Sequence, residues 1–144
     1  MKNSRTIANR ELFAIVRDTL LEGSTVRVTV NGQSMLPFFR SGSTITLRPV
    51  RKEDIRKYSV VMADAGDSFV VHRIIEVGEE YVTLLGDGNY KGTERVARDK
   101  IYGVVDCSKT HRFFARIWLW MRPVRRFPLA IFRVMMPKAA LFSR

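Results

Sequence analysis

The chain has 144 residues, a size typical of one domain, and 46% of them are hydrophobic, which suffices for an ordinary core. A single cysteine excludes an internal disulfide, and the lack of a Cys/His cluster argues against structural zinc. The net charge of +11 is concentrated at one end: the stretch 107–144 carries nine Lys/Arg and no Asp/Glu, whereas 1–106 is nearly neutral. A domain that binds nucleic acid over its whole surface would not have this distribution.

The chain is predicted to begin with a helix and to continue in strands. Residues 4–22 form the helix, because apolar residues recur at helical spacing up to Leu20 and Gly23 can end it. The strict alternation over 25–30 predicts a half-buried strand, which a turn at Asn31-Gly32 ends. Further strands are expected at 44–50, 58–62, 68–77, 81–85 and 100–106, with a tight turn at 63–67. Strands without intervening helices imply antiparallel pairing, so the expected fold class is mainly β.

Beyond residue 110 the composition becomes aromatic, apolar and basic, so we divide the chain into a domain at 1–110 and a tail at 111–144. On a helical projection the tail's arginines share one face and its Trp, Phe and Met fill much of the rest, which is typical of a segment on an anionic membrane surface. Pro123 and Pro128 predict short helical pieces instead of one helix. Packing on the domain or on a second subunit is the alternative, and nucleic-acid binding is the least favoured. His111 is interpreted as a surface residue.

The N-terminus leads into charged sequence instead of an apolar run, so we expect neither a secretory signal nor an N-terminal anchor. No stretch approaches the ~20 apolar residues that cross a bilayer. The expected location is therefore cytoplasmic, or peripheral at the inner face of a membrane.

Two segments carry side chains suited to nucleophilic catalysis. Ser34 follows a strand within the stretch 32–37, and a strand end with a Gly-containing turn can hold a hydroxyl rigidly and supply backbone N–H groups to an oxyanion. His72 lies in an apolar strand, and imidazole is the group that most often takes the proton of a serine near neutral pH. Each also has a structural interpretation, since turn serines commonly bond to backbone and His72 can be a core or edge histidine.

Four motifs, in this order, resemble the catalytic domain of signal peptidase I over about Val26 to Asp106. They are Gly32-x-Ser34-Met35-x-Pro37, Val71-His72-Arg73, Leu85-Gly86-Asp87-Gly88-Asn89 and Ile101-Tyr102-Gly103-Val104-Val105. Bacterial-type members have a lysine base before the arginine of the second motif. The endoplasmic-reticulum type, found also in archaea and some bacteria, has a histidine there, and His72-Arg73 is similar to this type. The peptidase domains of SOS-response repressors share the fold but use lysine.

The resemblance implies that Ser34 is the nucleophile, that His72 is the general base and that the Ser34 backbone N–H is one oxyanion donor. Asp87 matches the aspartate of the family's Gly-Asp box, and it is expected to organise the site or orient His72. A turn aspartate is the alternative for Asp87.

Three further residues bear on the site. Met35 would help to shape the substrate cleft. Gly32 stands where many signal peptidases have a serine whose hydroxyl helps to hold the oxyanion, so a second donor must come from elsewhere. The second aspartate of the histidine-type family falls near Glu94, which leaves Glu94 as the other candidate for the third catalytic group.

The resemblance implies a serine endopeptidase that cleaves a leader or signal-like peptide segment and uses no cofactor or metal. Its partner is a peptide or protein substrate that lies as a strand along the cleft. Two alternatives stay open. The chain can be a catalytically silent module of the same fold that binds a peptide or a membrane surface, or it can be a self-cleaving regulator.

Overall fold

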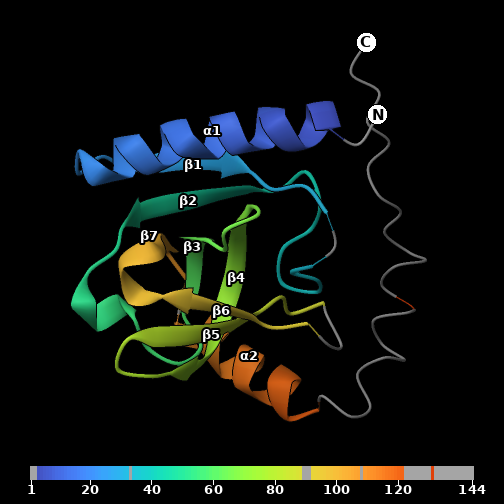
Figure 1. The fold of residues 1–144 in the computed structure, drawn as a ribbon. Coiled ribbons are helices and arrows are strands. Elements are labelled where there is room, and N and C mark those ends of the chain that lie inside the picture. Colours follow the sequence, from blue (N-terminus) through green and yellow to red (C-terminus); the bar gives the residue numbers. More distant parts are fainter. Residues whose placement is uncertain (1–2, 33, 89–91, 108, 122–130, 132–144) are drawn as a thin grey trace.

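The computed structural model describes residues 3–32, 34–88, 92–107, 109–121 and 131, and it contains one seven-stranded sheet and two α-helices (Figure 1). The strands are β1 (Val26–Thr29), β2 (Thr44–Pro49), β3 (Val60–Asp64), β4 (Phe69–Val77), β5 (Tyr81–Leu85), β6 (Glu94–Ala97) and β7 (Ile101–Val105). Their order across the sheet is β1-β2-β7-β3-β4-β5-β6, and each neighbouring pair is antiparallel. The expected mainly β, antiparallel fold class is confirmed.

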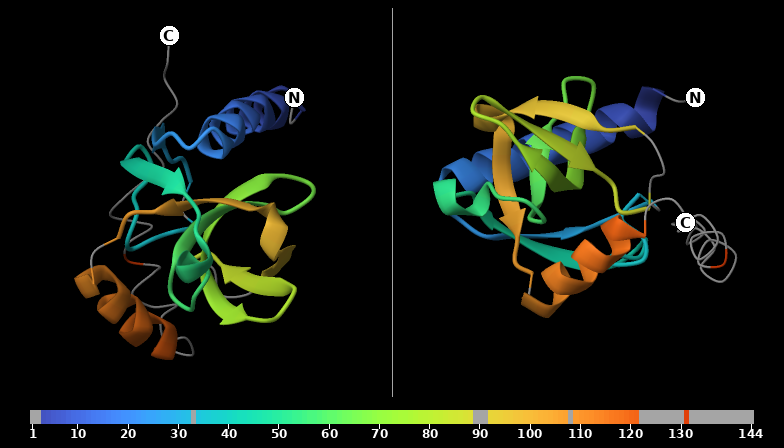
Figure 2. Two further views of the ribbon diagram at one scale, coloured as in Figure 1. Left: turned by 90° about the vertical axis from the view of Figure 1, so that its left-hand side faces the viewer. Right: turned by 90° about the horizontal axis from the view of Figure 1, so that it is seen from below.

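The strands form where side chains alternate or are continuously apolar. In β2, Ile45 and Leu47 are buried while Thr44 and Thr46 are exposed, which is the pattern of a strand with one face on the core. In β3, the four residues 60–63 are all buried, because this strand lies between β7 and β4 with both faces covered. The curled sheet in Figure 2 therefore encloses a core on its inner face and has another between the sheet and α1.

The helix α1 (Asn3–Leu21) packs along β1 and β2 (Figure 1). Val16 and Leu20 are buried in the core between this helix and the sheet. Gly103 of β7 allows the close approach, since a Cβ there would lie 2.8 Å from Cδ1 of Leu20. Burying side chains of this size contributes roughly 1.5–3 kcal/mol each, so the amphipathic pattern at 4–22 is explained by the contact of α1 with the sheet.

The strands differ from the sequence predictions in two places. The turn predicted at 63–67 begins later, because β3 continues to Asp64 before Gly66 reverses the chain with a φ of 93°. The strand β6 was not predicted; it is four residues long and has a charged start, so it lacks the alternation that marks β1. Two short 3₁₀ turns, Lys52–Asp54 and Arg98–Lys100, lie in the connections before β3 and β7.

The start of the predicted tail forms the helix α2 (Lys109–Trp120), on the opposite side of the sheet from α1 (Figures 1 and 2). Ala115 and Trp118 are buried, and Trp118 packs with the buried Leu36. The predicted breaks at Pro123 and Pro128 lie outside the described residues. No helix in the described part of the chain is both long and apolar enough to cross a membrane.

The interpretation of His111 as a surface residue is wrong. Its ring lies against Phe38 and Phe39, with centroids 4.7 and 5.2 Å apart, and both ring nitrogens are buried. Burial, with a smaller contribution from the charge of Arg73, lowers the pKa of His111 to about 4. The residue is a packing contact between α2 and the loop after Ser34.

Candidate active site

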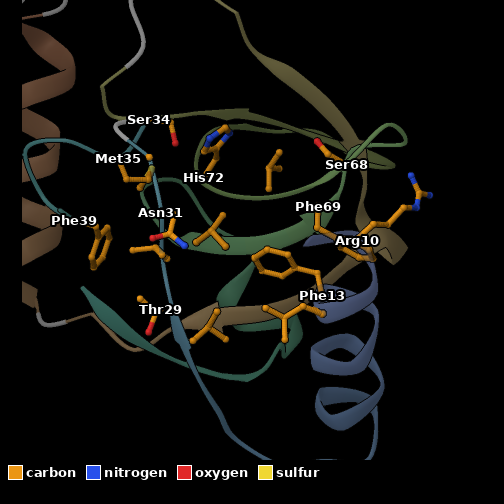
Figure 3. A pocket seen from close by; sticks show the side chains of 16 residues that line it. Arg10, Phe13, Thr29, Asn31, Ser34, Met35, Phe39, Ser68, Phe69 and His72 are labelled. Atoms are coloured by element: carbon orange, nitrogen blue, oxygen red, sulfur yellow. The ribbon is translucent and has the colours of Figure 1, made fainter. Parts of the chain in front are cut away.

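A pocket of about 430 Å³ lies between α1, the end of β1 and the first half of β4 (Figure 3). Its lining residues, grouped by chain order, are Arg10, Leu12 and Phe13, then 28–32, then Ser34, Met35 and Phe39, and finally 68–72. Among the residues that the structure describes, β1 pairs only with β2, and residues 69–72 of β4 pair only with β3. The pocket therefore lies between two strand edges that have hydrogen-bonding capacity for an extended peptide.

Ser34 and His72 both line this pocket. Ser34 comes from the loop after β1 and is partly buried, whereas His72 comes from β4 and is 7% exposed. In the close-up, Ser34 and His72 lie at the same end of the pocket (Figure 3). Two residues far apart in the sequence are thus brought to the same side of the sheet.

Glu94 is hydrogen-bonded to the His72 ring. Its Oε2 lies 2.9 Å from Nδ1 of His72, and the pair is partly buried, with side-chain exposures of 29% for Glu94 and 9% for His72. A carboxylate accepts hydrogen bonds, so in the neutral imidazole the proton is on Nδ1 and Nε2 keeps its lone pair. This is the tautomer that a general base needs in a Ser-His-carboxylate arrangement.

The sheet register explains why Glu94 reaches His72 across β5. Leu84 of β5 pairs with Ile74 of β4 on one side and with Glu94 of β6 on the other. His72 lies two residues before Ile74, on the same face of β4, beyond the last paired residue of β5, Leu85. Because β5 ends there, the side chain of Glu94 can extend along the sheet to the imidazole.

Asp87 is paired with an arginine of β4. Both of its carboxylate oxygens accept hydrogen bonds from Arg73, from Nε and NH2 at 2.7 Å each, and both side chains are fully buried. The contact with His72 Nδ1 is made by Glu94 instead. The ion pair with Arg73 is consistent with the expected role of Asp87 in organising the site, and that role stays a prediction.

The loop after β5 is tied to the nucleophile and to α2. The backbone N–H of Gly88 donates to the carbonyl of Ser34 at 2.6 Å. The indole N–H of Trp118 donates to the carbonyl of Asp87 at 2.8 Å, and this bond is buried. The guanidinium of Arg73 also lies over the ring of Phe38, 5.1 Å from its centroid. The carbonyl of Ser34 is therefore bonded to the loop after β5, and this loop is in turn bonded to β4 and to α2.

Gly32 and Met35 both line the pocket, as expected, but in different ways. Gly32 has a φ of 111°, a conformation that glycine adopts readily, and its N–H donates to Oγ of Ser41 at 3.1 Å. Its amide is thus engaged outside the pocket. Met35 is 7% exposed and belongs to the core beneath α1, so it connects the pocket floor to the packed interior.

Sequence reasoning left Glu94 as an unresolved alternative and did not single out Trp118. The signal for Glu94 was its position after the Gly-Asp motif, but a contact with His72 requires β6, which the sequence did not predict. For Trp118, the only indication in the sequence was that a large aromatic residue in the tail can pack against the domain. Among the described residues, no group of three or more His, Cys, Asp or Glu side chains is placed to hold a metal ion.

Residues 3–105 match the family model described as Peptidase S24-like, and this match covers more than half of the chain. No curated protein matches the sequence. The matched range contains all seven strands and the residues Ser34, His72, Asp87 and Glu94. The chain therefore belongs to the Peptidase S24-like family, whose fold is that of a serine peptidase or a self-cleaving regulator.

Proposed function

We propose that this protein is a serine endopeptidase in which Ser34 is the nucleophile, His72 the general base and Glu94 the carboxylate that orients the base. The observation that carries the proposal is the shared pocket: Ser34 and His72 line its end, and the Nδ1 atom of His72 is bonded to Glu94 at 2.9 Å. A histidine base is supported further because no lysine is among the described residues that line the pocket.

The reaction follows from these groups. The Oγ atom of Ser34 attacks the carbonyl carbon of the scissile peptide bond while Nε2 of His72 takes the hydroxyl proton. The tetrahedral intermediate collapses, the C–N bond breaks, and the imidazolium returns the proton to the leaving amine. Water, deprotonated by the same nitrogen, then releases the acyl group from Ser34. The backbone N–H of Ser34 is the proposed oxyanion donor.

The proposed substrate is a leader or signal-like peptide segment in extended conformation. An extended chain can add to the open edges of β1 and of residues 69–72, so that main-chain hydrogen bonds align it past Ser34. The pocket is lined by polar and apolar groups in similar measure, with Phe13 and Phe69 stacked at the end away from Ser34, 6.0 Å between centroids. These two rings offer an apolar contact to one side chain of the substrate at that end.

The test is cleavage of a synthetic leader peptide with small residues before the expected cut, followed by mass spectrometry of the products. The purified chain should give two defined fragments, Ser34→Ala should give none, and Ser68→Ala should behave as wild type, because Ser68 lines the other end of the same pocket. Equal cleavage by wild type and Ser34→Ala would remove Ser34 from the mechanism.

The family also contains the self-cleaving alternative, so the same experiment includes the protein incubated alone. A self-cleaving regulator would yield fragments of its own chain that disappear in Ser34→Ala. An intact chain together with cleaved peptide assigns the activity to a substrate supplied in trans. An intact chain and intact peptide under all conditions would favour the peptide-binding module over the enzyme.

A further inference from the structure

One surface of the molecule lies outside the proposed active site: the outer face of α2. Helix α2 buries one side against the protein through Ala115 and Trp118. The other side carries Phe113, Ile117 and Trp120, which recur at helical spacing and are 59%, 40% and 83% exposed. Phe114, next to this stripe, is 55% exposed. Four large apolar side chains exposed within about two turns of one helix are unusual for a folded surface.

Cationic side chains border this apolar face. Arg112 and Arg116 lie on one flank of α2 and the sequence of the helix contains no Asp or Glu. The guanidinium of Arg116 lies 5.8 Å from the ring centroid of Tyr58, and the ammonium of the exposed Lys57 lies 5.5 Å from the same ring. The positive border thus continues from the helix onto the connection before β3.

We propose that the outer face of α2 binds the interface of an anionic lipid bilayer. Aromatic rings on a helix insert at the boundary between headgroups and acyl chains, while flanking arginines pair with lipid phosphates. The charge of the chain favours this occupant over a second copy, since two molecules of net charge +11 repel each other. The aliphatic Ile117 within the aromatic stripe favours it over a nucleic acid, whose bases stack on rings.

The experiment is co-sedimentation of the full chain with vesicles of phosphatidylcholine alone and of phosphatidylcholine mixed with phosphatidylglycerol. The protein should bind the mixed vesicles, and added salt should weaken binding. The double variant Phe113→Ser/Trp120→Ser should bind at least about tenfold more weakly, and Arg112→Gln/Arg116→Gln should lose the preference for the anionic lipid. The matched control is Ile15→Ser/Leu21→Ser, which removes two exposed apolar residues from α1, 65% and 67% exposed, and should bind as wild type.

Tryptophan emission locates the contact. The chain has two tryptophans, the buried Trp118 and the exposed Trp120, so a blue shift on adding anionic vesicles should be present in the wild type and absent in Trp120→Phe. Unchanged binding by the Phe113/Trp120 variant would overturn the proposal, because it would assign binding to another part of the chain. Equal binding to neutral and anionic vesicles would also overturn the proposal. So would binding to a single-stranded oligonucleotide but not to vesicles, or a dimer of the wild type that is lost in the Phe113/Trp120 variant. None of these results depends on peptidase activity.

Discussion

Glu94 and His72 share a hydrogen bond of 2.9 Å although β5 lies between the strands that carry them. The bond restrains the imidazole ring at Nδ1 and leaves Nε2 of the neutral imidazole as the nitrogen that can accept a proton.

Replacing Glu94 with glutamine should lower kcat without raising KM. The amide oxygen can still accept the Nδ1 proton, but it does not stabilise the imidazolium that forms during the reaction. We expect a loss of roughly 10- to 100-fold, against the 10²- to 10⁴-fold that a general base contributes and that His72→Ala should remove. Steady-state kinetics on the leader peptide measures both constants. Glu80→Gln, an exposed change in the turn before β5, is the control and should leave both constants as they are.

Asp87→Ala should destabilise the protein by roughly 3–5 kcal/mol, because it leaves the fully buried Arg73 without its carboxylate partner. Urea unfolding measures the change. Replacing both partners with apolar residues, as in Arg73→Met/Asp87→Leu, should recover much of the loss. An Asp87→Ala protein as stable as wild type would contradict the assigned role. The control is Asp18→Asn, in an exposed pair with Arg17, which should leave the unfolding midpoint unchanged.

Trp118→Phe should reduce activity through the loop that it holds. Phenylalanine keeps most of the packing but has no N–H to donate to the buried carbonyl of Asp87, which should cost about 1–3 kcal/mol of stability. Because Gly88 is bonded to the carbonyl of Ser34, we also expect kcat to fall while KM changes little. Trp120→Phe, at the exposed position two residues on, should retain wild-type kinetics in the absence of lipid. A variant that loses stability and keeps kcat would show that Trp118 serves packing only.

The stability of the protein should fall between about pH 6.5 and about pH 4 because of His111. Its pKa is about 4 in the folded protein, lowered from 6.5 mainly by burial, so the unfolded chain binds a proton in this range that the native chain does not. The contribution is complete above the unfolded pKa and is lost as the pH falls toward the folded one. Partial exposure of the residue screens the effect to roughly 1–2 kcal/mol. Urea unfolding at several pH values, compared with His111→Phe, should show a shallower pH dependence in the variant.

The sequence predicted the local structure of the domain better than its long-range contacts. Alternation in β1 and the apolar run of β4 are local signals, so these strands and α1 could be placed within about two residues. Ser34 and His72 were identified because their motifs occur in a family order. The contacts of Glu94 and Trp118 depend on registers and on helix docking, which no local pattern encodes. The short β6 and the ring contacts of His111 were missed for the same reason.

Asp87 is hydrogen-bonded through its side chain to β4 and through its carbonyl to α2. These bonds bear on how much of the chain is needed for a folded domain. The family match ends at residue 105, before α2 begins. A fragment trimmed to the matched range would retain Ser34, His72 and Glu94 but would lack the indole that covers Asp87, and it would expose Leu36 beside the nucleophile. We therefore expect the smallest autonomous version of this protein to extend at least through Trp120, beyond the range that the family model matches.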